Sequence, residues 1–208
     1  MRCCGAPQPV LLETLKGEYT LLNGLATLVA VVDTANEWIG RVVAWLTLGC
    51  VLTCFLVVVL RYGFSIGFPW MQELYVWQLA VVFMVGAGFT LLHGGHVNVD
   101  IAYSRFPART KAWVDILGTL VFLLPWMAVL AWTSSQFVLA SWAILEPSSQ
   151  SNGMPGLYLL KTMIWVFCAV ISLQGIALIA RRVLFLNGRD DYSPNAASAS
   201  LHSSDAGA

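Results

Sequence analysis

The stretch RVVAWLTLGCVLTCFLVVVLR, from Arg41 to Arg61, places nineteen uncharged residues between two arginines. An α-helix rises about 1.5 Å per residue, so Val42–Leu60 is long enough to cross a hydrocarbon core of about 30 Å. The stretch therefore predicts a transmembrane helix.

The composition of the whole chain agrees with a membrane protein. Of its 208 residues, 58% are hydrophobic and 11% are charged, whereas a soluble domain carries about a quarter charged residues. Eleven basic residues balance eleven acidic ones, so no excess of positive charge indicates a nucleic-acid partner.

Three further apolar runs predict three further spans. Pro125 lies inside the second of these runs, where it removes a backbone donor and is expected to kink the helix. The last residues of that run, Ser141–Leu145, are expected in the membrane interface. The predicted fold is an all-α integral membrane protein with four transmembrane helices, and the runs are Leu74–Leu92, Ile116–Leu145 and Thr162–Ala180.

The distribution of basic residues predicts the orientation. With four spans, both termini and the middle loop share one side of the membrane. The other side holds only Arg61 and Lys161, so both termini are predicted to be cytoplasmic. The shared side holds nine basic residues: Arg2, Lys16, Arg41, Arg105, Arg109, Lys111, Arg181, Arg182 and Arg189.

Segments flank the predicted transmembrane domain, 41–186, on both sides. Within residues 1–40, the apolar positions of Leu21–Val32 recur at helical spacing. They predict an amphipathic helix that lies on the inner membrane surface or against a partner. The tail, 187–208, is rich in Ala and Ser and is predicted to be disordered.

Redox and metal functions have little support. Membrane haem subunits place histidines in two helices, but here His93 and His96 share one helix end and His202 lies in the tail. A haem or quinone anchor remains the alternative function. No complete metal-ligand set is present, and the cysteines form no pairs near the outer loops. We predict no cofactor, no metal site and no catalytic residue.

The segment GGHVNVDIAY, Gly94–Tyr103, carries His96 and Asp100 four residues apart. The pair is interpreted as a polar contact that fixes the inner end of the second span, and less readily as a proton relay. Gln174 is the one strongly polar residue deep in the fourth span. No Asp, Glu, Lys, Arg or His lies within a span, although transporters usually carry functional groups there.

The order and spacing of several short motifs resemble the small membrane subunit of tripartite ATP-independent periplasmic (TRAP) transporters, a DctQ-like component. The branch it most resembles is labelled for mannitol or chloroaromatic compounds. The family often has arginine where this chain has Asn98. The resemblance covers about Asn36 to Leu186 and is carried by LRYGFSIGFPWMQELYVWQLAVVFMVGAGFTLLHGGHVNVDIAYSRFPARTKAWVDILG, then FLLP, SW…E and YLLK.

This resemblance implies a transport protein of the bacterial inner membrane rather than an enzyme. The chain would form a heterodimer with a large membrane subunit and serve as its scaffold among the membrane lipids. A periplasmic binding protein would deliver an organic acid, and a sodium or proton gradient would drive its import. The absence of charge within the spans agrees with a scaffold role.

Four residues on the predicted outer side are candidates for structural or interface roles. Arg61 and Glu73 end the first span and open the second, and they are expected either to pair or to be solvated separately. Trp70 is interpreted as a membrane-belt residue, with contact to the binding protein as the alternative. Glu146 is a candidate for that contact because of its side of the membrane.

Overall fold

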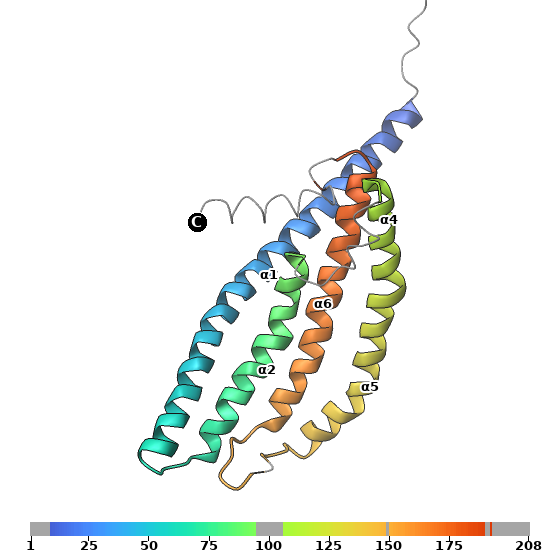
Figure 1. Ribbon diagram of the computed structural model, residues 1–208. Helices are drawn as coiled ribbons and strands as arrows, with labels where there is room; N and C mark the ends of the chain where they lie inside the picture. Colours follow the sequence, from blue (N-terminus) through green and yellow to red (C-terminus); the bar gives the residue numbers. More distant parts are fainter. Residues whose placement is uncertain (1–8, 95–105, 149, 190–191, 193–208) are drawn as a thin grey trace, which may run out of the picture.

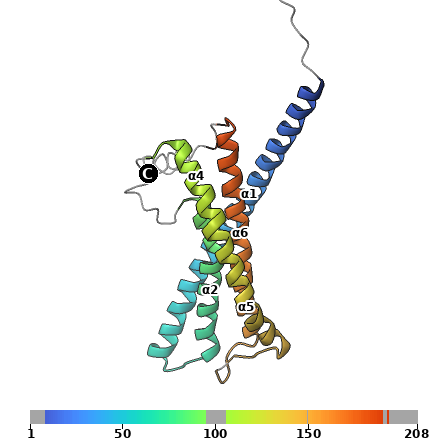
Figure 2. The same cartoon turned by 90° about the vertical axis from the view of Figure 1, so that its right-hand side faces the viewer.

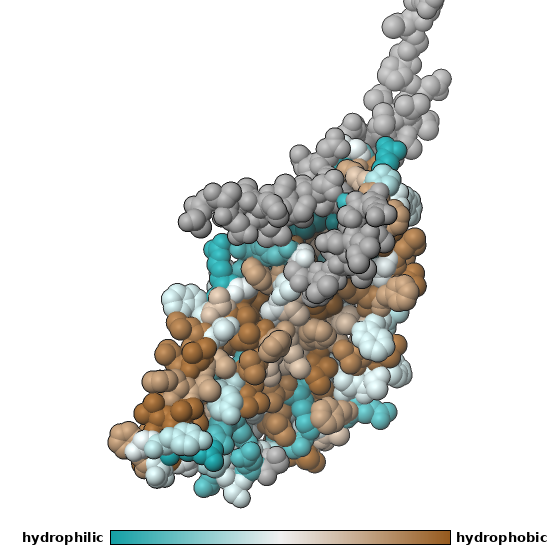
Figure 3. Space-filling view, in the orientation of Figure 1, coloured by the Kyte–Doolittle hydropathy of each residue, from teal (hydrophilic) through white to brown (hydrophobic). Residues whose placement is uncertain are grey.

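The computed structural model describes residues 9–94, 106–148, 150–189 and 192, with side chains from residue 21 onward. In this part of the chain, four long helices are apolar enough to cross a membrane, as predicted. They lie side by side in Figure 1, and their apolar residues cover the flanks of the molecule in Figure 3. The predicted His96–Asp100 contact lies outside the described residues, as does most of the predicted disordered tail.

Helix α1, Pro9–Gly63, is much longer than a membrane is thick. Its 55 residues correspond to about 80 Å, against about 30 Å for a hydrocarbon core. Figures 1 and 2 show its N-terminal part continuing past the other helices. Leu21–Val32 is helical, as predicted, and is continuous with the first span.

Helix α2, Pro69–Leu92, begins with a proline in its first turn, where the missing N–H leaves no hydrogen bond unmade. It runs antiparallel to α1, and glycines bring the two helices close together. A side chain at Gly40 would collide with the ring of Phe89, and one at Gly86 would touch Val43 at 3.4 Å.

The third span is one bent helix in three parts: α4, Ala108–Gly118, the π-helical turn η1, Thr119–Leu123, and α5, Leu124–Ala143. The N–H of Leu124 donates to the carbonyl of Thr119, one residue further back than in an α-helix. Pro125 follows at once, so the widened turn accommodates the proline ring. The kink predicted at Pro125 thus takes the form of a π-helical turn. Figure 1 shows the helix curving between α4 and α5.

Helix α6, Leu157–Leu186, is the centre of the molecule because it packs against α1, α2 and the bent third helix. A Cβ on Gly175 would lie 2.9 Å from the Leu123 side chain and 3.2 Å from the Thr119 side chain, so the side chains of η1 pack directly on the α6 backbone. In the most apolar eighteen residues of α6 one third are buried, whereas in the most apolar eighteen residues of α1 none is fully buried. Many large apolar side chains on the outside of the bundle are therefore not covered by other residues of this chain.

Candidate functional site

Ion pairs tie the predicted cytoplasmic ends of three helices together. Two consecutive arginines of α6 reach in different directions: Arg181 binds Asp33 of α1, and the Nε of Arg182 donates to Asp115 of α4 at 2.7 Å. Because neighbouring residues on a helix point to different sides, this pair of arginines joins α6 to both α1 and α4. Arg189, just beyond α6, donates to the Asn23 side chain of α1 at 2.8 Å.

A second group at the same end joins α1 to α2. The Nε2 of His93 lies 3.4 Å from the Glu37 carboxylate, and its Nδ1 lies 3.1 Å from the carbonyl oxygen of Phe89. Arg41 approaches Glu37 from the next turn of α1, at 3.8 Å. His93 is the histidine that the structure describes, and it is engaged with the protein on both ring nitrogens.

One buried polar contact lies between α1 and α6 on the membrane side of these ion pairs. The amide of Asn36 donates to the side-chain oxygen of Gln174 at 2.5 Å, and the two residues are 4% and 2% exposed. Gly88 of α2 lies against this pair, because a Cβ there would be 2.9 Å from the Asn36 oxygen. Gln174 thus has a partner that holds three helices in register.

At the opposite, predicted outer end, Glu146 joins the end of α5 to the start of α6. Its carboxylate accepts from the Lys161 ammonium and from the Ser141 hydroxyl, each at 2.5 Å. Lys161, and to a lesser degree Ser141, hold the pKa of Glu146 below its ordinary value. The Lys161 ammonium also lies 4.0 Å from the centre of the Phe137 ring.

Glu73 of α2 holds the loop between α5 and α6. Its carboxylate accepts from the Ser148 hydroxyl and, at 2.6 Å, from the backbone N–H of Met154. Gly153 lies directly over this contact, where a Cβ would be 2.7 Å from a Glu73 oxygen. In the described part of the chain Glu73 therefore binds this loop and does not pair with Arg61, whose side chain is exposed.

The two sets of polar contacts are one membrane thickness apart. Twenty residues separate Glu73 from His93 on α2, and twenty separate Lys161 from Arg181 on α6. In each helix that interval is about 30 Å, which matches a hydrocarbon core. Figure 3 shows hydrophilic residues at the two ends of the bundle and hydrophobic residues between them.

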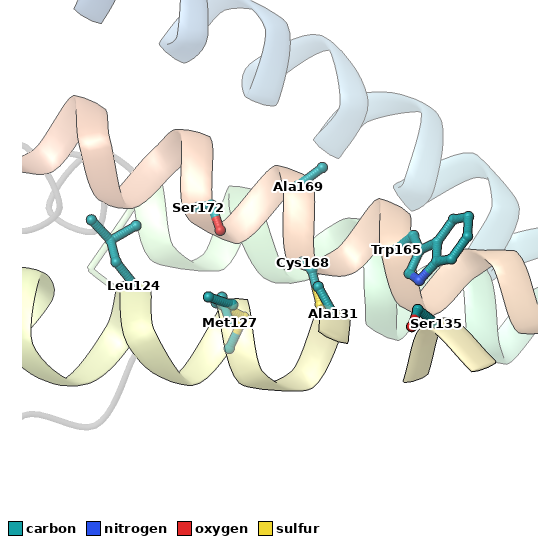
Figure 4. Close-up of a pocket in the computed structure, with 9 residues that line it drawn as sticks. Leu124, Met127, Ala131, Ser135, Trp165, Cys168, Ala169 and Ser172 are labelled. Atoms are coloured by element: carbon teal, nitrogen blue, oxygen red, sulfur yellow. The ribbon is translucent and has the colours of Figure 1, made fainter. Parts of the chain in front are cut away.

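A groove of about 410 Å³ runs between α5 and α6 on the apolar surface. Figure 4 shows small residues such as Ala131 and Ser172 lining it beside Met127 and Cys168. No group of three or more His, Cys, Asp or Glu suited to a metal ion occurs in the described part of the chain. The groove therefore offers packing space and hydroxyl groups, but no acid–base pair.

A comparison with protein families identifies this architecture. Residues 49–185 match the model of the tripartite ATP-independent periplasmic transporters, DctQ component. The chain belongs to the DctQ family. It is the small component of a TRAP transporter, a transport protein rather than an enzyme, in a family that works with a large membrane component and a periplasmic binding protein. No curated protein and no solved structure matches it closely.

The structure places the predicted residues of this DctQ chain in separate contacts. Gln174 lies in the buried polar pair, and Glu73 and Glu146 hold the outer loop. Arg61 and Trp70 are exposed, and the Trp70 ring lies 6.2 Å from that of Phe68. His96 and Asp100 lie outside the described residues.

Several functional contacts were missed by sequence reasoning. Asp33 and Asp115 were not singled out, and Lys161 was counted only for the orientation, although each of the three pairs with a residue of another element. The motifs SW…E and YLLK did contain a signal for the contact between α5 and α6, because their residues bind one another. Glu146 binds Ser141 and Lys161, and the ring centres of Trp142 and Tyr158 lie 4.6 Å apart. Asn36 had no such signal, because it precedes the apolar run.

Proposed function

We propose that this DctQ chain is the scaffold subunit that holds a large membrane component in place while that component moves the substrate. The observation that supports this role is the openness of the bundle. In the most apolar eighteen residues of each helix, 33% are buried in the central helix α6, but only 0% in α1 and 6% in α2. A chain with so much uncovered apolar surface and no charge within its spans is suited to packing against another membrane protein.

The proposed transport reaction is the import of an organic acid across the bacterial inner membrane, driven by a sodium or proton gradient. A periplasmic binding protein delivers the substrate, and the large component carries the substrate and ion sites. Resemblance to the mannitol and chloroaromatic branch supports a monocarboxylic or aromatic acid. This assignment rests on family membership, because the described part of the chain lacks clustered ligands of its own.

Reconstitution tests the scaffold role directly. Three samples of proteoliposomes are compared, which contain this chain alone, the large subunit alone, or both. Each sample also receives the purified periplasmic binding protein of the same transporter. Import of radiolabelled organic acids under a sodium or proton gradient is expected only when both subunits are present. Uptake by this chain alone would overturn the proposal, and so would full uptake by the large subunit without it.

A further inference from the structure

A second groove, with a volume of about 530 Å³, lies between α1 and α2. Residues with small side chains or none line it on both helices: Gly40 and Ala44 on α1, Gly86 and Ala87 on α2. Phe83 lies at its edge and is 72% exposed. All nine residues that line the groove are uncharged, so it offers an apolar surface to a hydrocarbon chain.

The groove is about as long as one leaflet of a membrane is thick. Val82 and Thr90 line it on α2 and are eight residues apart, which corresponds to about 12 Å along a helix. Half of a hydrocarbon core measures about 15 Å. Thr90 is three residues before His93, one of the polar residues at the end of the bundle. The groove therefore starts at this polar end and runs inward, as the acyl chain of a lipid does.

Two opposite charges lie on α1 at the polar end of the groove. Glu37 and Arg41 stand on either side of Gly40 in the sequence, and their side chains are 41% and 73% exposed. Their carboxylate and guanidinium are 3.8 Å apart, which is longer than a hydrogen bond. In the described ranges 9–94, 106–148, 150–189 and 192, Arg41 has no other partner. Its N–H donors are therefore available to a ligand.

An exposed cation beside an exposed anion complements a ligand that carries both charges. A guanidinium binds phosphate oxygens through its N–H groups, and a carboxylate accepts hydrogen bonds from an ammonium. A headgroup with a phosphate alone would leave Glu37 facing a like charge. A quaternary ammonium has no N–H to donate to Glu37. A phosphate linked to a primary ammonium satisfies both side chains.

We propose that the groove between α1 and α2 binds one phospholipid of the phosphatidylethanolamine class. One acyl chain lies in the groove, the phosphate binds Arg41, and the primary ammonium binds Glu37. The lipid thereby covers apolar surface that the chain itself leaves exposed on this helix pair. The inference requires only that the chain spans a membrane, so it does not depend on the proposed transport role.

Native mass spectrometry of the full-length chain, stripped of lipid in detergent, measures this binding. Phosphatidylethanolamine, phosphatidylcholine and phosphatidylglycerol with identical acyl chains are titrated separately. We expect one phosphatidylethanolamine per chain, bound about tenfold more tightly than either of the others. Phosphatidylcholine lacks the N–H donors for Glu37, and phosphatidylglycerol lacks the cation, so each loses one charge-assisted bond.

Two substitutions separate the roles of the charges. Arg41→Gln should weaken phosphatidylethanolamine binding about tenfold because the phosphate loses its charged donor. Arg109→Gln is the matched control, since Arg109 is an exposed arginine at the same end of the bundle, and it should leave the affinity unchanged. Glu37→Gln should instead remove the preference for phosphatidylethanolamine over phosphatidylglycerol.

A third substitution tests the groove itself. Ala44→Phe places a ring where the acyl chain lies and should weaken the binding of all three lipids. Ala140→Phe makes the same change at an exposed position of α5 outside the groove, and it should bind lipid as the wild type does. Because Ala44 and Arg41 are both exposed, we expect these variants to fold, and their melting temperatures check this.

Three outcomes would overturn the proposal. The first is equal affinity of the wild type for the three lipids, and the second is equal binding by Arg41→Gln and Arg109→Gln. The third is loss of the bound lipid when the large subunit is added, because the groove would then hold a helix of that subunit. Retention of one phosphatidylethanolamine in the two-subunit complex would support the lipid as the occupant.

Discussion

Gly88 of α2 lies against the buried hydrogen bond between Asn36 of α1 and Gln174 of α6. Its missing side chain leaves room for the Asn36 oxygen, which would lie 2.9 Å from a Cβ, and for Val170 of α6. A Cβ on Gly88 would also lie 2.3 Å from the Val170 side chain, so either this side chain and Asn36 or α2 itself would have to shift, and a shift of Asn36 would disturb its hydrogen bond to Gln174.

Gly88→Ala is therefore expected to destabilise the bundle by about 1–3 kcal/mol, the usual effect of overpacking. Gly118→Ala is the control, since nothing lies within 4 Å of the Cβ it would add. That change should be neutral or stabilise by about 0.5–1 kcal/mol, because alanine favours helix. Thermal unfolding in detergent compares the two variants, and equal melting temperatures would contradict the packing at Gly88.

Glu146 makes the outer end sensitive to acid. Its folded-state pKa lies below the ordinary value of 4.5, chiefly because the carboxylate binds Lys161. A depressed pKa means that the folded state binds its proton less readily than the unfolded state. The stabilisation is therefore fully present above about pH 4.5 and is lost as the pH falls through the folded-state pKa.

The melting temperature of the wild type is thus expected to decrease below pH 4.5 more steeply than that of Glu146→Gln. Glutamine cannot form the ion pair at any pH, so its melting temperature should be lower at pH 7 and should converge with the wild type in acid. Parallel profiles from pH 7 to pH 3 would show that the Lys161 contact contributes nothing to stability.

At the scale of elements, the N-terminal half of α1 has two different faces. Val29 is 3% exposed and Leu21 is 71% exposed, although both belong to the same apolar segment. The buried face lies where α1 packs against α6, whose Leu184 is fully buried. The opposite face is open in this chain.

Val29→Asp should destabilise the fold by about 3–5 kcal/mol, the cost of a buried charge without a partner. Leu21→Asp, an equal change in chemistry, should alter the stability of the bundle by about 0.5 kcal/mol or less because the other helices do not cover its side chain. The yield of folded protein after detergent extraction and gel filtration measures both variants. A stable Val29→Asp variant would argue against the α1–α6 contact.

At the scale of the whole molecule, the orientation in the membrane follows from the charges on the loops. The start of α1, the start of α4 and the end of α6 lie at one end of the bundle in Figure 1. The described part of the chain has seven basic residues toward that end, which are Lys16, Arg41, Arg109, Lys111, Arg181, Arg182 and Arg189, so we expect it to face the cytoplasm.

Reporter fusions after Pro107 and Gly188 should therefore be active as cytoplasmic reporters, and a fusion after Gly153 should be active as a periplasmic one. The three positions lie in loops or at helix ends, so each fusion leaves the preceding spans intact. A cytoplasmic signal at Gly153 would contradict the four-span topology.

The sequence by itself determined the membrane class, the four spans and the disturbance at Pro125. These properties depend on local composition: a helix crosses a bilayer when about twenty consecutive residues are apolar, whatever the rest of the chain does. The sequence also predicted the apolar, helical character of Leu21–Val32. It did not predict that this helix continues into the first span, because helical periodicity alone does not show whether a helix stops between two apolar segments.

Only the tertiary structure decided which polar residues meet. Asp33 and Arg181 are 148 residues apart in the chain, and Glu73 reaches the N–H of Met154 across 81 residues. Such partners depend on how the helices are rotated and on which glycines let them approach, and no local pattern encodes either. For this reason Gln174 was recognisable as unusual from the sequence, but its partner Asn36 was found only when α1 and α6 were seen together.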